Sequence, residues 1–245
     1  MSTFSMQGRM VVAEDANALA RLAAEWFVQT VAAQASDVRV SLSGGSTPKT
    51  LYHLLGSEPY RARIPWQRLE LFWGDERFVS HDSPDSNYHM ARQALLDSAP
   101  IPPARIHPVP TDGTPADAAQ RYEAELRRSY GADALDPARP LFDIMLLGLG
   151  SDGHTCSLLP GQPVLDERDH WVAPVMSGRD EPRVTLTYPA VESSRALAFL
   201  VSGTDKARAL KAVREGDQSL PAARIHTAGE VIWFVDAAAA GGLAG

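Results

Sequence analysis

Cysteine is almost absent from this chain of 245 residues, which contains only Cys156. A single cysteine forms neither an intramolecular disulfide nor a cysteine-based zinc cluster. Long apolar runs are also missing, since none approaches the roughly 18 residues of a membrane-spanning helix. The first residues have neither the basic start nor the apolar stretch of a signal peptide. We therefore expect a soluble, cytoplasmic protein that makes no membrane contact.

Positive charge is in short supply as well. The chain carries 23 Lys and Arg against 30 Asp and Glu, which gives a formal net charge of -7. That balance argues against a broad surface for nucleic acid or for anionic lipid. It still permits one small anion to be held locally. We expect a small-molecule partner, with the protein acting as a monomer or a small homo-oligomer.

Several well-known catalytic motifs are absent. The chain has no Walker A loop, no G-x-S-x-G elbow and no H-E-x-x-H, and its seven histidines show no convincing spacing for metal ligands. These absences argue against a P-loop nucleotide site, a serine hydrolase of the elbow type and a zinc protease. The sequence therefore predicts no metal site.

Helical periodicity is clearest in two segments. In residues 15–31 apolar side chains recur every three or four positions, and Asp15 fits the N-cap position. In residues 114–130 Thr114 precedes Pro115, an order that favours a cap followed by a first helical turn. Shorter helices are expected over residues 48–55, 86–96 and 205–213.

Short apolar runs lie between these helices and predict strands. Alternation of strands with helices favours right-handed crossovers and a mainly parallel, Rossmann-like sheet with helices on both faces. We expect one α/β domain over residues 1–245, with 237–245 as a flexible tail. The five stronger runs are residues 38–42, 69–73, 142–147, 196–201 and 231–235, and the two weaker ones are 171–175 and 183–187.

Four of the five stronger runs end in a loop of small and polar residues. The carboxyl ends of parallel strands meet at one edge of a sheet, where open α/β sheets bind their ligands. The sequence therefore predicts a single cleft. Its loops are residues 43–46, 74–77, 148–154 and 202–206.

The first loop reads Ser43-Gly44-Gly45-Ser46 and is followed by a threonine and a proline that suit a helix start. Free backbone N–H groups and the positive end of a helix dipole would then face an incoming anion, such as phosphate. The alternative is a tight turn that needs glycine only for its backbone dihedrals. The loop alone favours neither interpretation.

The third loop, residues 148–154, matches G-x-G-x-x-G and ends in His154. A dinucleotide site is disfavoured, because Pro160 leaves room for barely two helical turns after the loop. An imidazole at this position can take a proton from water near neutral pH, and a neighbouring carboxylate can orient it. An ordinary loop histidine is the alternative. Cys156 is expected to be a small packed residue.

The second loop contains Asp75, Glu76 and Arg77 directly after an apolar run. Because alternate side chains of a strand point in opposite directions, Asp75 and Arg77 are expected to share one side and Glu76 to face the other. A surface turn with local ion pairs is the alternative. Of the later cations, Arg183 and Lys206 are best placed to assist a phosphate, although each alone would be read as a solvated surface charge.

Taken together, these segments resemble the 6-phosphogluconolactonase family over almost the whole chain and in family order. The resemblance implies hydrolysis of 6-phospho-D-glucono-1,5-lactone in the oxidative pentose phosphate pathway, without metal or organic cofactor. The matching segments are SLSGGSTP (41–48), WGDERFV (73–79), DSNY (85–88), GLGSDGHTCSLLPG (148–161), RVTLT (183–187), GTDKA (203–207) and LPAA (220–223).

On this basis we hypothesise that His154 activates a water molecule against the lactone carbonyl. Either Asp152 or Asp75 would orient the imidazole or the water. The phosphate and the sugar hydroxyls would be held by Ser43, Gly44, Gly45, Ser46, Arg77, Arg183 and Lys206.

Two other functions stay open at this point. Glucosamine-6-phosphate deaminases share the architecture and look similar around the glycine loop and the Gly-His pair. In them, however, the next segment contains a glutamate associated with sugar-ring opening, whereas here His154 is followed by Thr155-Cys156-Ser157-Leu158-Leu159-Pro160. The other alternative is a non-catalytic sensor of sugar phosphates, which the presence of both Asp152 and His154 disfavours.

Overall fold

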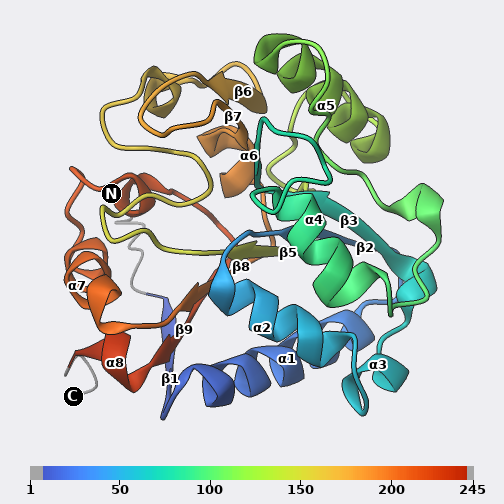
Figure 1. Ribbon diagram of the computed structural model, residues 1–245, viewed down its shortest axis with the longest axis vertical. Helices are drawn as coiled ribbons and strands as arrows, with labels where there is room; N and C mark the ends of the chain where they lie inside the picture. The colour runs from blue at the N-terminus through green and yellow to red at the C-terminus, as the bar shows by residue number, and fades with distance from the viewer. Residues whose placement is uncertain (1–7, 242–245) are drawn as a thin grey trace.

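Two β-sheets organise the computed structural model, which describes residues 8–241 (Figure 1). The larger sheet has six strands in the order β1-β9-β8-β5-β2-β3, and every neighbouring pair is parallel. This confirms the predicted α/β fold with a parallel sheet. The strands are β1 (Arg9–Ala13), β2 (Val38–Leu42), β3 (Leu69–Trp73), β5 (Ile144–Leu147), β8 (Ala196–Val201) and β9 (Glu230–Asp236).

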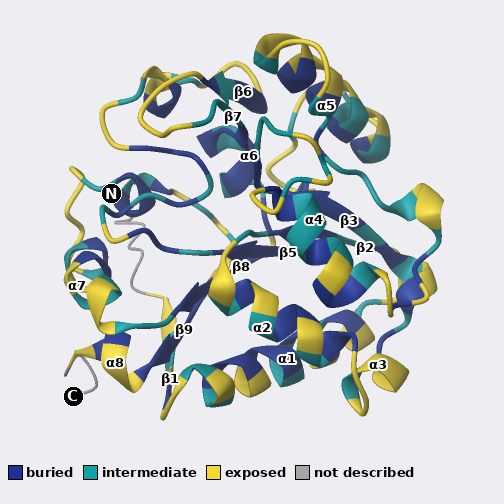
Figure 2. Ribbon diagram, in the orientation of Figure 1, coloured by how far each residue is buried: buried dark blue, intermediate teal, exposed yellow. Residues whose placement is uncertain are grey.

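Helices flank this sheet and bury its strands. All residues of β5 and β8 are buried, as their nearly continuous apolar sequences require for strands covered on both faces (Figure 2). No helix within residues 8–241 is both long enough and apolar enough to span a bilayer. The helices are α1 (Ala16–Ala33), α2 (Ser46–Leu55), α3 (Tyr60–Arg63), α4 (Asn87–Ala91), α5 (Pro115–Tyr130), α6 (Tyr188–Glu192), α7 (Ala207–Arg214) and α8 (Ala237–Ala240).

The two longest helices begin where their sequences predict. Asp15 caps α1 by accepting a 2.7 Å hydrogen bond from the backbone N–H of Ala18. Thr114 caps α5 by accepting one of 3.2 Å from Asp117, with Pro115 in the first turn. The cap residues therefore set the start of each helix, and the apolar faces then pack inward.

A second sheet, of three antiparallel strands in the order β4-β7-β6, was not predicted (Figure 1). Its strands are β4 (Asp75–Arg77), β6 (Val172–Val175) and β7 (Arg183–Leu186). The sequence did not predict β4 as a separate strand, because its residues are charged and acidic residues are depleted in strands. The two weaker apolar runs do form strands, but they belong to this sheet.

Gly74 is the residue at which the chain passes from one sheet to the other. Its N–H donates to the carbonyl of Leu42 in β2 at 2.9 Å, while its carbonyl accepts from the N–H of Leu186 in β7 at 2.8 Å. Tyr122 of α5 fixes the adjoining end of β3, accepting from the N–H of Trp73 at 2.7 Å and donating to its carbonyl at 3.0 Å. Within residues 8–241, Gly74 is thus a position at which main-chain hydrogen bonds join the two sheets.

Several element boundaries differ from those predicted. The helix expected over 48–55 begins at Ser46, the one over 86–96 divides into α4 and a π-helical turn (Arg92–Leu96), and the one over 205–213 is α7 preceded by a 3-10 turn (Thr204–Lys206). Strand β1 was missed, since only Ala13 of its five residues is buried.

The prediction of a flexible tail from residue 237 was wrong for its first residues. Asp236 caps α8 by accepting a 2.7 Å hydrogen bond from the N–H of Ala239, and both Ala239 and Ala240 are buried. The side-chain cap and the burial of these two methyl groups stabilise α8, although a run of alanines suggested a flexible tail. Residues 242–245 lie outside the described part of the chain.

The strand order creates a switch point between β2 and β5. After β2 the chain crosses to β3 on one side, and it later returns to β5 on the other side of β2. The loops that leave β2 and β5 therefore diverge at the carboxyl edge. In open α/β sheets such a divergence opens the crevice in which ligands bind.

Candidate active site

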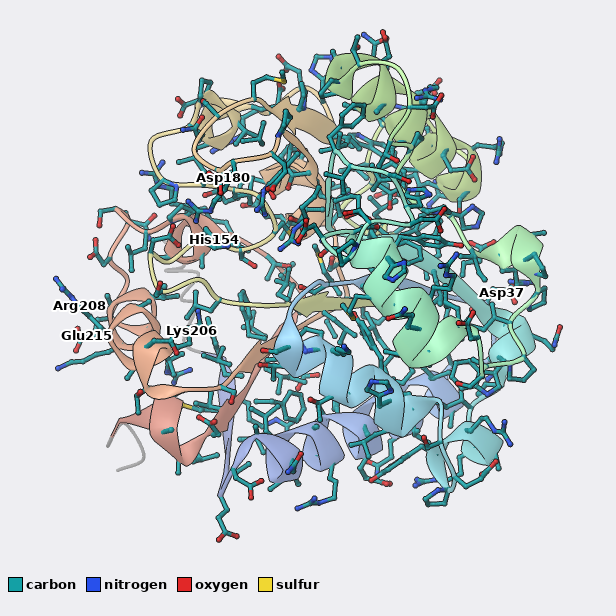
Figure 3. The ribbon with its side chains drawn as sticks, in the orientation of Figure 1. Asp37, His154, Asp180, Lys206, Arg208 and Glu215 are labelled. Atoms are coloured by element: carbon teal, nitrogen blue, oxygen red, sulfur yellow. The ribbon has the colours of Figure 1, made fainter. Side chains whose placement is uncertain are left out.

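A cavity of about 220 Å³ lies at this edge and collects all four predicted loops. Figure 3 labels His154 and Lys206, which reach it from the loops after β5 and β8. The prediction of one cleft is confirmed by its lining. Of the predicted site residues, those that line the cavity are Ser43, Gly44, Gly45, Ser46, Asp75, Arg77, His154, Arg183 and Lys206.

The glycine loop after β2 combines the two interpretations that the sequence left open. Gly45 has φ +103°, a conformation that favours glycine, and a Cβ on Gly44 would lie 1.9 Å from Oδ1 of Asn87. Gly45 also caps α2 without any side-chain hydrogen bond to its N-terminal N–H groups. The glycines are therefore needed for the turn, and the turn leaves the positive end of α2 at the cavity.

Tyr52 of α2 fixes the start of this loop. Its hydroxyl accepts a 2.8 Å hydrogen bond from the N–H of Ser43 and donates one of 2.8 Å to the carbonyl of the same residue. Burial raises the pKa of the Tyr52 phenol above its ordinary value, so the group stays neutral and can serve both roles. The helix thus holds the loop that precedes it.

His154 and Asp152 form a direct pair in the loop after β5. Nδ1 of the imidazole lies 2.5 Å from Oδ1 of Asp152, and the backbone N–H of His154 donates to the same oxygen at 3.2 Å. A carboxylate accepts from Nδ1–H, which leaves the lone pair on Nε2. No hydrogen bond to Nε2 comes from the described residues, and the side chain is 24% exposed. The imidazole is therefore set up to accept a proton at the cavity.

The G-x-G-x-x-G glycines make room for this pair. A Cβ on Gly150 would lie 2.0 Å from Nδ1 of His154 and 2.6 Å from Oδ1 of Asp152. Gly153 has φ +78°. Between this loop and the 3-10 turn that begins at Pro163, no helix begins. The loop lacks the helix start that a dinucleotide pyrophosphate needs, which agrees with the sequence argument against such a site.

Arg179 also contacts Asp152, although it was not among the residues predicted from the sequence. It lies between β6 and β7, and its Nη2 donates to Oδ2 of Asp152 at 2.6 Å and lies 3.3 Å from Nδ1 of His154. Burial raises the pKa of the Asp152 carboxyl, but the hydrogen bonds from Arg179 and His154 outweigh it and hold that pKa well below its ordinary value. A lone arginine in a loop carries no motif that could have revealed this contact.

Asp75 occupies a different place from Asp152. Its carboxylate accepts from the Ser157 hydroxyl at 2.6 Å and from the Asn87 amide at 3.4 Å, and lies 3.9 Å from Nη1 of Arg183. No described contact joins it to His154. Of the two carboxylates that the sequence offered as partners of the imidazole, Asp152 is therefore the one that touches it, and Asp75 belongs to the cavity wall.

Glu76 faces away from the cavity, as the strand alternation predicts. Its carboxylate accepts backbone N–H groups from Arg77, Asn87 and Tyr88 at 2.7 to 2.8 Å, and the Ser86 hydroxyl at 3.0 Å. Burial raises the pKa of Glu76, with these hydrogen bonds opposing the change. Glu76 thus ties the start of α4 to β4 and places Asn87 beside Asp75.

The cations of the cavity keep buried donors without partners. Nε of Arg77, Nε of Arg183 and the Thr155 hydroxyl are buried and have no hydrogen bond from the described residues. Burial is the largest influence on Arg183 and lowers its pKa, while Asp75 opposes it. Because unsatisfied buried donors are costly, a ligand rich in acceptor oxygens would suit this wall.

Comparison with known proteins gives a consistent result. A sequence model described as "Glucosamine-6-phosphate isomerases/6-phosphogluconolactonase" matches residues 14–233. The chain belongs to this family. A 6-phosphogluconolactonase of Synechocystis sp. is 45% identical over 201 residues, covering 80% of this chain and 81% of its own. That of Homo sapiens is 37% identical over 234 residues, covering 91% and 87%.

Solved structures of the glucosamine-6-phosphate isomerase/6-phosphogluconolactonase family share the fold. The 6-phosphogluconolactonase from Trypanosoma cruzi superposes with a TM-score of 0.86 at 30% identity, over 98% of each chain. A monomeric glucosamine-6-phosphate deaminase gives 0.79 at 22% identity, over 95% of this chain and 99% of its own, and shows the fold alone. This lactonase and this deaminase therefore share the architecture of the present chain.

In this member of the family Cys156 lies directly against the cavity. It has φ +49°, unusual for a residue with a side chain, and burial followed by the charge of Asp75 raises the pKa of its thiol well above the ordinary value. A protonated thiol is a poor nucleophile. The prediction that Cys156 is a packed bystander fits this environment.

Proposed function

We propose that this protein hydrolyses 6-phospho-D-glucono-1,5-lactone to 6-phosphogluconate, in the oxidative pentose phosphate pathway. The observation that carries the proposal is the His154–Asp152 pair, whose imidazole lines a cavity that Arg77 and Arg183 also line. Curated relatives at 35% to 45% identity that bear the name 6-phosphogluconolactonase support it.

In the proposed reaction Nε2 of His154 takes a proton from a water molecule, and the oxygen of that water attacks the carbonyl carbon of the lactone. The new C–O bond gives a tetrahedral oxyanion, and the imidazolium is stabilised by Asp152. Collapse of the intermediate breaks the bond to the ring oxygen, which leaves with the proton of the imidazolium. The ring opens to the hydroxy acid, whose carboxyl group then ionises, and His154 returns to its neutral form.

Binding and oxyanion stabilisation fall to the remaining predicted residues. A phosphate offers acceptor oxygens to the unpartnered Nε groups of Arg77 and Arg183 and to the ammonium group of Lys206. The N–H groups of Gly44 and Gly45 lie at the start of α2, where a negative charge is stabilised by the helix dipole. One acidic chain can thus bind an anionic substrate through a local arrangement of donors.

All the residues proposed for the site come from one chain. We propose that residues 1–245 act as one catalytic domain, because the cavity draws residues from both sheets. A monomer would suffice, and a small homo-oligomer is compatible with it. A cytoplasmic location is proposed from the single cysteine, which is typical of a reducing compartment.

A coupled assay tests the function. Glucose 6-phosphate is oxidised by its dehydrogenase, and decay of the lactone is followed with and without this protein, above the spontaneous rate. Acceleration is expected for the wild type and not for His154→Ala. An unaccelerated decay would refute the proposal, and release of ammonia from glucosamine 6-phosphate would identify the deaminase activity of the other branch instead.

A further inference from the structure

A guanidinium group from the smaller sheet's loop contacts the carboxylate beside the imidazole. Arg179 lies between β6 and β7 and donates through Nη2 to Oδ2 of Asp152 at 2.6 Å, while Oδ1 of Asp152 lies 2.5 Å from Nδ1 of His154. Figure 3 labels His154 and Asp180, the residue after Arg179, in the same part of the molecule. The three side chains therefore form a chain that ends at the cavity.

We propose that Arg179 is a positioning residue that fixes the Asp152 carboxylate and, through it, the tautomer and orientation of His154. The proposal rests on the function proposed above. Among described residues, Arg179 is the only side chain that donates to Oδ2 of Asp152. Without it this carboxylate, which is 37% exposed, would be free to rotate and to exchange Oδ1 for water.

The position of Arg179 argues against direct contact with the substrate. Its Nη1 donates to the carbonyl of Gly178 at 2.8 Å and its Nη2 to Asp152, so both terminal nitrogens are engaged. Arg77 and Arg183 line the cavity and each keeps a buried Nε that has no hydrogen bond from the described residues, whereas Arg179 is not part of the described lining. Three cations, Arg77, Arg183 and Lys206, thus line the cavity, whereas Arg179 contacts the carboxylate beside the imidazole.

Charge gives Arg179 a second effect on the same pair. The guanidinium offsets the negative charge of Asp152 and lies 3.3 Å from Nδ1 of His154, so on both counts it opposes a positive charge on the imidazole. The charged groups that line the cavity together with His154 are Asp75, Arg77, Arg183 and Lys206. Removing Arg179 leaves these unchanged, and should make protonation of the imidazole easier.

The experiment compares Arg179→Gln and Arg179→Lys with Arg208→Gln, a matched substitution at an exposed site on α7 (Figure 3). We expect Arg179→Gln to lower kcat on the order of 10-fold, the low end for residues that orient a catalytic ligand, with KM changed by less than about twofold. Arg179→Lys should recover part of the loss. The acid limb of the kcat/KM profile should move to higher pH in Arg179→Gln only.

A double-mutant cycle separates positioning from binding. In an Asp152→Asn background Arg179→Gln should cause no further loss, because the carboxylate through which it acts is gone. An equal loss in both backgrounds, or a raised KM with kcat unchanged, would mean that Arg179 binds substrate and would overturn the proposal. Thermal unfolding of each variant shows that the comparison is made on folded protein.

A measurement that needs no lactonase activity keeps the two proposals distinguishable. Long-range ¹⁵N NMR of the His154 ring should show the Nδ1–H tautomer in the wild type, and a mixture of tautomers or a protonated ring in Arg179→Gln at the same pH. If the wild type hydrolyses no lactone, the proposed function fails, and this spectrum still tests Arg179. An identical ring spectrum in both proteins would refute the positioning role.

Discussion

The two sheets contribute to the cavity in different ways. The parallel sheet provides groups from loops at its carboxyl edge, namely the glycine loop after β2, His154 after β5 and Lys206 after β8. The antiparallel sheet provides Asp75, Arg77 and Arg183 from within β4 and β7. His154, the residue expected to transfer protons, thus lies on a loop of the larger sheet. Two of the three cations expected to hold the substrate, Arg77 and Arg183, lie on short strands of the smaller one.

The largest effect should follow from removing the imidazole of the larger sheet. His154→Ala is expected to lower kcat about 10³-fold, within the range of general acid–base catalysis, with a small change in KM. Initial rates in the coupled lactone assay give both constants. Turnover near the wild-type value in a folded variant would show that the proton is taken elsewhere, and the comparison of the sheets would lose its basis.

Crowding the same pair without removing it should have the next largest effect. A methyl group in Gly150→Ala would lie 2.0 Å from Nδ1 of His154, so the imidazole must move. We expect kcat to fall on the order of 100-fold, since misplacing a catalytic group by about 1 Å has effects of that size.

Gly56→Ala is the matched control for this substitution, because its Cβ meets the hydroxyl of Ser98, and neither residue lines the cavity. Its kcat should stay near the wild-type value. If Gly150→Ala also retained full activity, the contact between the glycine and the imidazole would have no catalytic meaning.

A change in the smaller sheet should act on binding. Arg183→Gln removes a largely buried cation from the cavity wall and is expected to raise KM about 10-fold or more, because a charge-assisted hydrogen bond to phosphate is lost. The exposed variant Arg208→Gln serves as control in the same assay. A fall in kcat at unchanged KM would contradict the division of labour between the sheets.

The smallest effect should be on how the stability of the fold changes with pH. Because the pKa of Asp152 is lower in the folded protein than its ordinary value, its carboxylate stabilises the fold at neutral pH, and this contribution is lost as pH falls from about 5 toward 2. The group is 37% exposed, so we expect less than about 1 kcal/mol.

Urea unfolding of the wild type and Asp152→Asn at pH 7 and pH 3 measures this difference. The wild type should be the more stable at pH 7, and its advantage should shrink at pH 3. A difference that is equal at both pH values would mean that the carboxylate makes no net contribution. Asp180→Asn, in an exposed position of the neighbouring loop, provides the control.

Sequence reasoning located the cleft because its signals are local. A glycine loop directly after an apolar run, or His154 two residues after Asp152, can be read within one segment of chain. The same holds for the caps of α1 and α5. Parallel pairing of the strands then brings separate loops to one edge of the sheet. The shared location of these residues could therefore be predicted without knowing their side-chain contacts.

The features that were missed depend on contacts across long stretches of sequence. Arg179 reaches Asp152 over 27 positions, and Ser157 reaches Asp75 over 82. Strand β4 exists because β7 pairs with it, although its charged residues have little strand propensity of their own. Tertiary pairing therefore determined the smaller sheet and the second partner of Asp152.

The hydrogen bonds of Gly74 have a consequence for how the enzyme would lose activity. One residue, bonded to Leu42 through its N–H and to Leu186 through its carbonyl, makes the position of Arg77 and Arg183 depend on the register of the core strands. Separation of the smaller sheet would remove Arg77 and Arg183 from the cavity while the imidazole and Lys206 stayed in place. Inactivation would then appear first as weakened affinity, in a protein whose main core is still folded.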